Sequence, residues 1–257
     1  MMMMKGVEEG ERRREMERTR KTRFAPDIVE PLFYALAATS VLCAALIAIR
    51  ALRMEDVQYR FLLWNLFLAW LPLIVSMAAL TLVRVARGAV LGTGLAVLGV
   101  AWLLLYPNAP YLTTDFVHLI FDTFYNRYDK DGLLLWYDLV LFFLFSWCGL
   151  LLGYLSMRHF HEIVGHYFGL LAGWAFILTV SFLGGFGVYL GRVVRLNSWD
   201  VLFSPFRLIE GVLEGINAQA AGFTLLFGTL ILIVYVSLFL GWNRRSSSSS
   251  ATIGEGP

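Results

Sequence analysis

Charged residues are scarce in this sequence. Only 16% of its 257 residues are Asp, Glu, Lys or Arg and 58% are apolar, whereas a soluble domain is about 25% charged and about 45–50% apolar. The mean hydropathy of +0.67 reflects the same imbalance. This composition excludes a soluble enzyme and a disordered chain, and a net charge of +2 is too small for a nucleic-acid-binding domain. We therefore predict a multi-pass membrane protein whose partner is the lipid bilayer and not a nucleic acid.

Cysteines are few, and the common catalytic motifs are missing. Cys43 and Cys148 both lie in apolar runs, so they predict no disulfide framework. The sequence contains no phosphate-binding loop, dinucleotide fingerprint, haem-attachment motif or nucleophile elbow. His161 and His166 are five residues apart and do not share the helix face that a zinc protease needs, so we interpret this stretch as a polar link. We predict no metal site, and the sequence leaves any cofactor unknown.

Six apolar stretches reach or approach the length of a transmembrane helix, which takes roughly 20 residues for a bilayer core of about 30 Å. They cover residues 31–49, 61–83, 89–106, 133–157, 167–190 and 222–240. We expect an all-α, polytopic membrane bundle of about six transmembrane helices, with short interfacial amphipathic helices. One such helix is expected at residues 206–216, either flat on the membrane surface or as a lid over the bundle.

The two ends of the chain differ from its apolar middle. Residues 1–28 carry dense charge of both signs and residues 242–257 are polar, so both segments are predicted to be disordered. Residues 29–241 form the predicted membrane domain. With six spans, Lys and Arg are more numerous on the side that carries both termini, which places both termini in the cytoplasm.

With this orientation, the long links at residues 107–132 and 191–221 both lie on the extracytoplasmic side. Pro107 opens the first link and ends the third span, after which a helix restarts. On that helix Asp115, His118 and Asp122 follow one another at i, i+3 and i+7, so they share one face. These side chains could bind a cation, relay protons or act as general acid and base. Alternatively, the face simply meets headgroups and water while the opposite, apolar face anchors the helix.

Polar residues outside this helix strengthen the prediction of a site. Asp138 lies near the start of the fourth span, where an acid needs a partner, a cavity or a path to the interface. Arg192 and Arg195 are three residues apart and share a helix face if the fifth span continues that far. These arginines could neutralise the acids of the first link or bind a phosphate or carboxylate, or they could extend to the interface as structural residues.

We predict that the two long links meet and form one polar extracytoplasmic site. The candidate catalytic residues are Asp115, His118, Asp122 and Asp138. The candidate binding residues are Asn108, Arg192, Arg195, Asn197 and Asp200.

Three blocks of the sequence resemble one family of multi-pass bacterial membrane proteins, the domain of unknown function 1361. The blocks are WLLLYPNAPYLTTDFVHL at residues 102–119, WYD at 136–138 and RVVRLNSWD at 192–200. The resemblance spans residues 32–240 and leaves out both charged ends. It implies a helical bundle in the bacterial inner membrane, and it implies no activity, substrate or catalytic residue.

Three functions therefore stay open, and the sequence does not decide whether the protein is an enzyme. The first is an accessory or partner-binding membrane protein. The second is a membrane-embedded enzyme that acts on a lipid or lipid-linked phosphate substrate. The third is a proton- or cation-coupled transporter of small solutes. A cavity open to lipid would favour the enzyme, a continuous polar path the transporter, and a fully paired polar cap the accessory protein.

Overall fold

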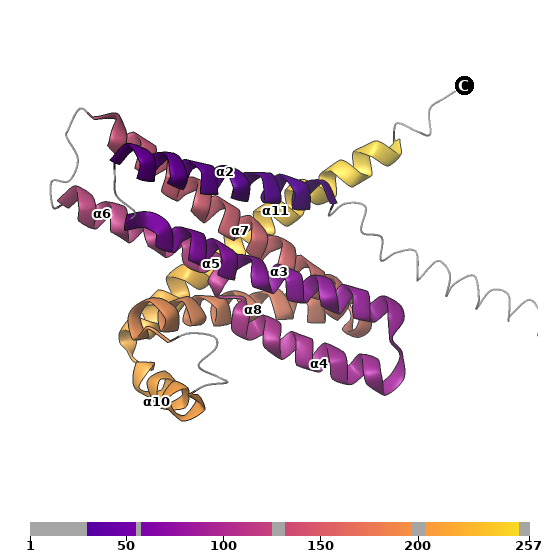
Figure 1. Cartoon of the computed structure of the whole chain (residues 1–257). Helices are drawn as coiled ribbons and strands as arrows, with labels where there is room; N and C mark the ends of the chain where they lie inside the picture. The colour runs from indigo at the N-terminus through magenta and orange to yellow at the C-terminus, as the bar shows by residue number, and fades with distance from the viewer. Residues whose placement is uncertain (1–29, 55–57, 125–131, 197–203, 252–257) are drawn as a thin grey trace, which may run out of the picture. The chain divides into compact units, whose positions relative to one another are not determined.

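The computed structural model describes residues 30–54, 58–124, 132–196 and 204–251 (Figure 1). The chain divides into two units, residues 1–38 and 39–257, and every contact described below lies within the second unit. The regular structure of the described residues is entirely helical, which confirms the predicted fold class. The prediction that residues 1–28 are disordered concerns a segment outside the described residues, and Asn197 and Asp200 also lie outside them.

Nine α-helices and three shorter helical turns make up the described chain. The α-helices are α2 (Glu30–Met54), α3 (Phe61–Val85), α4 (Gly88–Leu105), α5 (Asn108–Tyr111), α6 (Phe116–Phe124), α7 (Leu133–Phe168), α8 (Leu170–Tyr189), α10 (Pro205–Gly215) and α11 (Ala218–Ala251). The turns are the 3₁₀ segments η2 (Gln58–Arg60) and η3 (Leu112–Asp115) and the π-helical turn η4 (Leu190–Val194).

Six of the described segments are long and apolar enough to cross a membrane, which confirms the predicted number of spans. They are Pro31–Arg53, Gln58–Val85, Gly88–Phe121, Leu133–Phe168, Leu170–Val194 and Ala218–Gly241. The last of these helices, α11, runs on to Ala251 and so enters the tail for which the sequence predicts no structure. Residues 252–257 lie outside the described residues.

The fourth span is longer than the sequence predicts. α7 continues to Phe168 instead of ending near residue 157, so the interpretation of the stretch around His161 as a polar link is wrong. His159 and His161 are buried in the helical bundle. Each has a hydroxyl partner, because His159 Nδ1 lies 2.8 Å from Ser76 Oγ and His161 Nδ1 lies 2.6 Å from Tyr235 Oη. These hydrogen bonds offset part of the cost of burying the imidazoles, although Nε2 of His159 has no partner among the described residues.

The third span is a broken helix that stays inside the bundle. Proline has no N–H group to continue the backbone ladder, and α4 ends two residues before Pro107. The backbone at Tyr106 and Pro107 nevertheless remains in the right-handed helical region, so the chain continues through α5 and η3 into α6. Along this path α4, α5 and η3 all contact α3 (Figure 1).

Glycines on α7 and α8 make room for the broken segment. A Cβ atom at Gly149 of α7 would lie 2.5 Å from the carbonyl oxygen of Ala109, and a Cβ at Gly187 of α8 would overlap the ring of Pro107. A side chain at either position would push the broken segment away, so glycine permits the close approach. The break in the third span is therefore packed against α7 and α8, so the backbone groups that the proline leaves without a helical partner are covered by protein.

Candidate functional site

One face of α7 organises the polar residues of the candidate site. Asp138, Phe142, Ser146 and Gly149 follow one another at intervals of four, four and three residues, so they line one side of the first half of the helix. All four are buried. Ser146 donates a hydrogen bond from Oγ to the carbonyl oxygen of Leu112 at 3.0 Å, which ties the 3₁₀ segment to α7.

Asp138 forms a closed ion pair with Arg50 of α2. Arg50 donates from Nε to Oδ1 at 2.7 Å and from Nη2 to Oδ2 at 3.0 Å, and the two side chains are only 8% and 0% exposed. The guanidinium carbon of Arg50 also lies 4.1 Å from the centre of the Tyr59 ring. Next to this pair, Tyr137 donates from its hydroxyl to the carbonyl oxygen of Leu46 at 2.6 Å. Both carboxylate oxygens of Asp138 are thus occupied by a bidentate arginine.

This pairing differs from the predicted one, in which Asp138 lies near Arg192 and Arg195. Arg50 is four residues from the end of the first span, and Asp138 is five residues after the start of the fourth. An arginine near the end of one span and an acid near the start of an antiparallel span lie at similar depths in the membrane. Such a placement predicts an ion pair between them. The sequence does not say that α2 and α7 are neighbours, so the signal could not be used.

Asp115 is the centre of a second buried cluster. Its Oδ1 accepts a hydrogen bond from Nη1 of Arg192 at 3.3 Å, and its Oδ2 accepts one from Nδ2 of Asn65 at 2.9 Å. The same Nη1 lies 3.2 Å from the hydroxyl of Tyr111, whose ring centre is 5.7 Å from the guanidinium carbon. Asp115 is 1% exposed and Arg192 is 20% exposed. The structure therefore brings together one acid of the first link and one arginine of the second.

Asn65 and Tyr111 complete this cluster, and neither was predicted from the sequence as a site residue. Asn65 lies in the first turns of α3, among residues that are otherwise apolar. Such a lone amide inside a span is costly unless it has a partner, which is the signal that could have identified it. Tyr111 follows the second proline of the first link, and a tyrosine at this position is typical of an aromatic residue at the membrane interface.

Aromatic side chains separate the two clusters. Tyr59, which stacks on Arg50, meets the edge of Phe142 with ring centres 5.0 Å apart. Phe142 in turn lies 6.2 Å from the ring of Phe116, the residue after Asp115. A row of aromatic rings, the aromatic layer, therefore runs from Arg50 to the residue next to Asp115. Apolar surroundings of this kind strengthen the attraction between paired charges.

Asp115 lies at the end of η3 and is buried in the bundle. Asp115 is buried together with Leu112 and Leu119, whereas Ile120 and Phe121 are 66% and 55% exposed. One of the two interpretations of the sequence placed the charged face in headgroups and water, with Leu112 and Leu119 on the opposite face. The 3₁₀ geometry of η3 changes the side-chain spacing before α6, so an α-helical pattern over this stretch fails.

The other predicted residues of the first link lie outside this contact. His118 is half-buried, with its ring centre 4.7 Å from that of Phe61. Asp122 belongs to α6, and its side chain lies outside the described residues. Asn108 donates from Nδ2 to the carbonyl oxygen of Leu105 at 2.8 Å. In a regular α-helix the carbonyl oxygen of Leu105 would accept a hydrogen bond from the N–H group of Ala109. That N–H group instead donates to the carbonyl oxygen of Tyr106, so the side chain of Asn108 supplies the missing donor.

Arg192 and Arg195 do not share a helix face. α8 passes into the π-helical turn η4, and the chain then leaves the helical conformation at Arg195, whose φ is 63° and ψ is 39°. Arg195 is exposed, whereas Arg192 turns back towards Asp115. A π-helical turn changes the angular spacing of side chains, and such turns are frequent at functional sites. This geometry gives the two arginines different environments.

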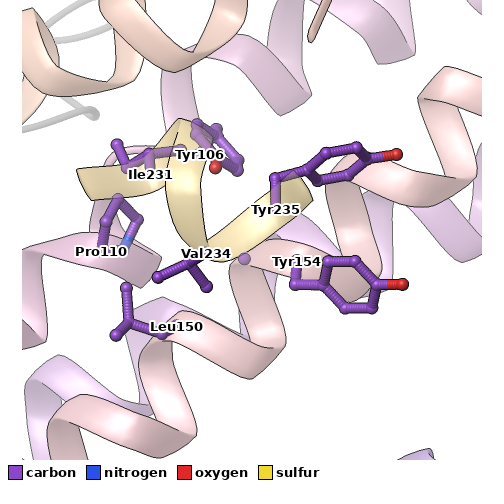
Figure 2. Close-up of a pocket in the computed structure, with 8 residues that line it drawn as sticks. Tyr106, Pro110, Leu150, Tyr154, Ile231, Val234 and Tyr235 are labelled. Atoms are coloured by element: carbon purple, nitrogen blue, oxygen red, sulfur yellow. The ribbon is translucent and has the colours of Figure 1, made fainter. Parts of the chain in front are cut away.

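A crevice lies near the middle of the bundle, apart from both ion pairs. Figure 2 shows side chains of α7 and α11 around it together with Tyr106 and Pro110 of the broken third span. It has room for about one water molecule. Its lining is apolar apart from tyrosine hydroxyls, and none of the predicted site residues belongs to it. Within the described ranges, no group of three or more His, Cys, Asp or Glu side chains could hold a metal ion.

Comparison with known proteins identifies the family. The sequence profile of the family described as "Protein of unknown function (DUF1361)" matches residues 64–234. The chain belongs to this family. The match confirms the predicted resemblance, and no curated protein and no solved structure matches the chain. In this DUF1361 protein the matched segment contains Asn65, Asp115, Asp138 and Arg192, whereas Arg50 lies before it.

Proposed function

We propose that this DUF1361 protein is a partner-binding membrane protein, not an enzyme, and that Arg192 receives an anionic group of the partner. The observation that carries the proposal is a contrast between two arginines. Arg50 is buried and gives two nitrogens to Asp138. Arg192 is part-exposed and gives only Nη1 to Asp115 and Tyr111.

Among the described residues, Nε and Nη2 of Arg192 have no hydrogen-bond partner. Asp115 and Tyr111 hold the guanidinium in place, so these donors are positioned before any ligand arrives. A fixed, planar guanidinium with two donors that no described residue uses suits a phosphate or carboxylate, which it can bind in a bidentate manner. Exposed Arg195, three residues further along, adds positive charge on the same segment.

The state of the two acids argues against catalysis. A general base must come within hydrogen-bond distance of its substrate, directly or through one water. Asp115 and Asp138 are 1% and 0% exposed, and both oxygens of each carboxylate already accept hydrogen bonds. These acids fix the arginines and the broken helix, so the site is a paired polar cap and not a reactive pocket.

The position of Arg192 favours a lipid headgroup as the anionic partner. η4 ends a membrane span, so Arg192 lies near the level at which lipid phosphates are found. We place this end of the bundle outside the cytoplasm of a bacterial inner membrane, with both termini inside, from the distribution of Lys and Arg and from the family resemblance. An enzyme that acts on lipid-linked phosphates would bind its substrate through the same arginine. Unlike a binding protein, it would also convert that substrate into a product.

A lipid titration tests this proposal. Phosphatidic acid, which exposes a terminal phosphate, is added to the purified full chain in detergent, and bound lipid is counted by native mass spectrometry. Loss of a charge-assisted hydrogen-bond donor in Arg192→Gln is expected to weaken binding by roughly tenfold or more, because such bonds contribute about 1.5–3 kcal/mol. Phosphatidylcholine, whose phosphate is blocked by choline, is expected to bind wild type and variant alike.

Arg158→Gln is the matched control. Arg158 is 15% exposed and forms an ion pair with Glu162 at 3.0 Å, so it resembles Arg192 in burial but lies in the second half of α7. This variant is expected to keep the affinity of the wild type. Equal binding of phosphatidic acid by wild type and Arg192→Gln would refute the proposed contact. Release of phosphate or of a headgroup during incubation would instead show an enzyme.

A further inference from the structure

α10 carries an apolar stripe that nothing in the described chain covers. Phe206, Ile209, Leu213 and Ile216 follow at intervals of three, four and three residues, which places them on one side of the helix. They are 86%, 56%, 66% and 65% exposed. A contiguous exposed stripe of large apolar side chains marks an interaction surface.

The opposite side of α10 is seated on the end of α8. A Cβ atom at Gly211 would lie 3.2 Å from Leu196, and a Cβ at Gly215 would lie 3.3 Å from Val194. Glycines therefore let this side of α10 approach η4 and the residues after it. This contact with η4 and Leu196 sets the direction of the apolar stripe, because the glycines and the stripe lie on different sides of the helix.

Charged residues occupy the sector between the glycines and the stripe. Glu210 and Glu214 are one turn apart and both are exposed. The helix therefore has three distinct sectors, of which one contacts protein, one is apolar and one is acidic. This division is typical of a helix that lies at a boundary between an apolar phase and water.

The connections of α10 place it at the level of a membrane boundary. It packs on the turn that ends the fifth span, and α11, which forms the sixth span, begins at Ala218, three residues after α10 ends. With 11 residues α10 is roughly 16 Å long, so it is too short to cross a bilayer core of about 30 Å. Both neighbouring spans also expose large apolar side chains, such as Leu183 of α8 and Leu225 of α11.

We infer that α10 binds the surface of the lipid bilayer, with the stripe of Phe206, Ile209, Leu213 and Ile216 inserted at the boundary between headgroups and acyl chains. Glu210 and Glu214 then face water. α10 contains Arg207, Glu210 and Glu214 and so has a net charge of −1, which means that burial of apolar area and not attraction to anionic lipid drives this contact. None of the observations that support this contact involves Arg192 or the anion that we propose for it.

Fluorophores at single introduced cysteines test this inference on the full chain. Cys43 and Cys148 are 0% exposed, so a water-soluble maleimide is expected to leave them unlabelled. Ile209→Cys and Leu213→Cys report on the stripe, and Glu210→Cys and Glu214→Cys are matched controls one position away. Each labelled variant is reconstituted in phosphatidylcholine vesicles, with an environment-sensitive probe whose quenching by brominated acyl chains and by aqueous iodide is measured.

The stripe positions are expected to show blue-shifted emission and quenching by brominated lipid that is several-fold stronger than at the two glutamate positions. The glutamate positions are expected to be quenched mainly by iodide, and adding phosphatidylglycerol to the vesicles is expected to change neither pattern. Equal quenching by iodide at all four positions would overturn the inference. Protection of the stripe from both quenchers would also overturn it, because protein and not lipid would then cover α10.

Discussion

Arg50 and Asp138 are 88 residues apart in the chain and form a bidentate ion pair, with nitrogen–oxygen distances of 2.7 and 3.0 Å. The contact joins the end of the first span to the start of the fourth. It is surrounded by Tyr59 and the aromatic layer, so neither charge reaches water. Burying two charges costs several kcal/mol each, and only their close mutual contact offsets this cost.

Removal of one partner from this pair is therefore expected to destabilise the fold. Asp138→Asn leaves the Arg50 guanidinium buried without a counter-charge, which typically costs about 3–5 kcal/mol. The measurement is thermal unfolding of the purified full chain in detergent. The double variant Arg50→Met with Asp138→Leu is expected to recover most of the loss, because it removes both charges and keeps the volume.

An exposed ion pair provides the comparison for this experiment. Arg158 and Glu162 are four residues apart on α7, and Glu162 is 47% exposed. Pairs of this kind contribute only about 0.3–0.5 kcal/mol, so Glu162→Gln is expected to unfold close to wild type. If Asp138→Asn were no less stable than Glu162→Gln, the buried pair would not hold α2 to α7 in the way described.

Asn65 is expected to matter for stability through the carboxylate that it supports. It donates to the buried carboxylate of Asp115 at 2.9 Å from inside a span. Asn65→Leu leaves one oxygen of Asp115 without its donor, and such a loss costs roughly 1–3 kcal/mol of unfolding free energy. Thr81→Val, which removes an exposed hydroxyl bonded to the backbone of its own helix, is the control and is expected to have little effect. Equal unfolding temperatures for the two variants would contradict this role of Asn65.

The spans and the break in the third helix could be predicted from the sequence because both depend on local properties. The length of an apolar run decides whether a helix can cross the bilayer, and a proline removes a backbone donor wherever it stands. The prediction that the two long links meet also placed Asp115 and Arg192 close together, and they lie 3.3 Å apart.

The partners of the charged residues could not be predicted in the same way. Pairing Asp138 with Arg50 requires knowledge of which helices are neighbours, and this depends on packing between residues far apart in the chain. The inward direction of Asp115 depends on one 3₁₀ turn, and the left-handed conformation of Arg195 separates it from Arg192. Local periodicity assumes regular α-helix and therefore fails at these irregular turns.

Two glycines one turn apart on α7 offer a test of the packing of the broken helix. A Cβ at Gly149 would lie 2.5 Å from the backbone oxygen of Ala109, whereas a Cβ at Gly153 would lie 3.4 Å from the nearest atom, the Cβ of Ala109. Gly149→Ala forces the broken segment to shift, and such overpacking costs about 1–3 kcal/mol. Gly153→Ala is expected to be neutral or to stabilise by up to about 1 kcal/mol, because alanine favours helix. Equal unfolding temperatures for the two variants would show that Ala109 does not approach α7 this closely.

The contact between α10 and η4 is expected to influence anion binding at Arg192, because η4 carries both this contact and the side chain of Arg192. In Gly211→Leu the added side chain meets Leu196, whose nearest atom already lies 3.2 Å from the position of a Cβ. α10 must then move away from the end of α8, so Arg192 loses part of the packing that fixes it and phosphatidic acid is expected to bind more weakly. Gly222→Leu at the start of α11 is the control, because no atom lies within 4 Å of a Cβ there. If Gly211→Leu bound phosphatidic acid as wild type does, while the fluorescence of a probe on α10 changed, α10 and Arg192 would be independent of each other.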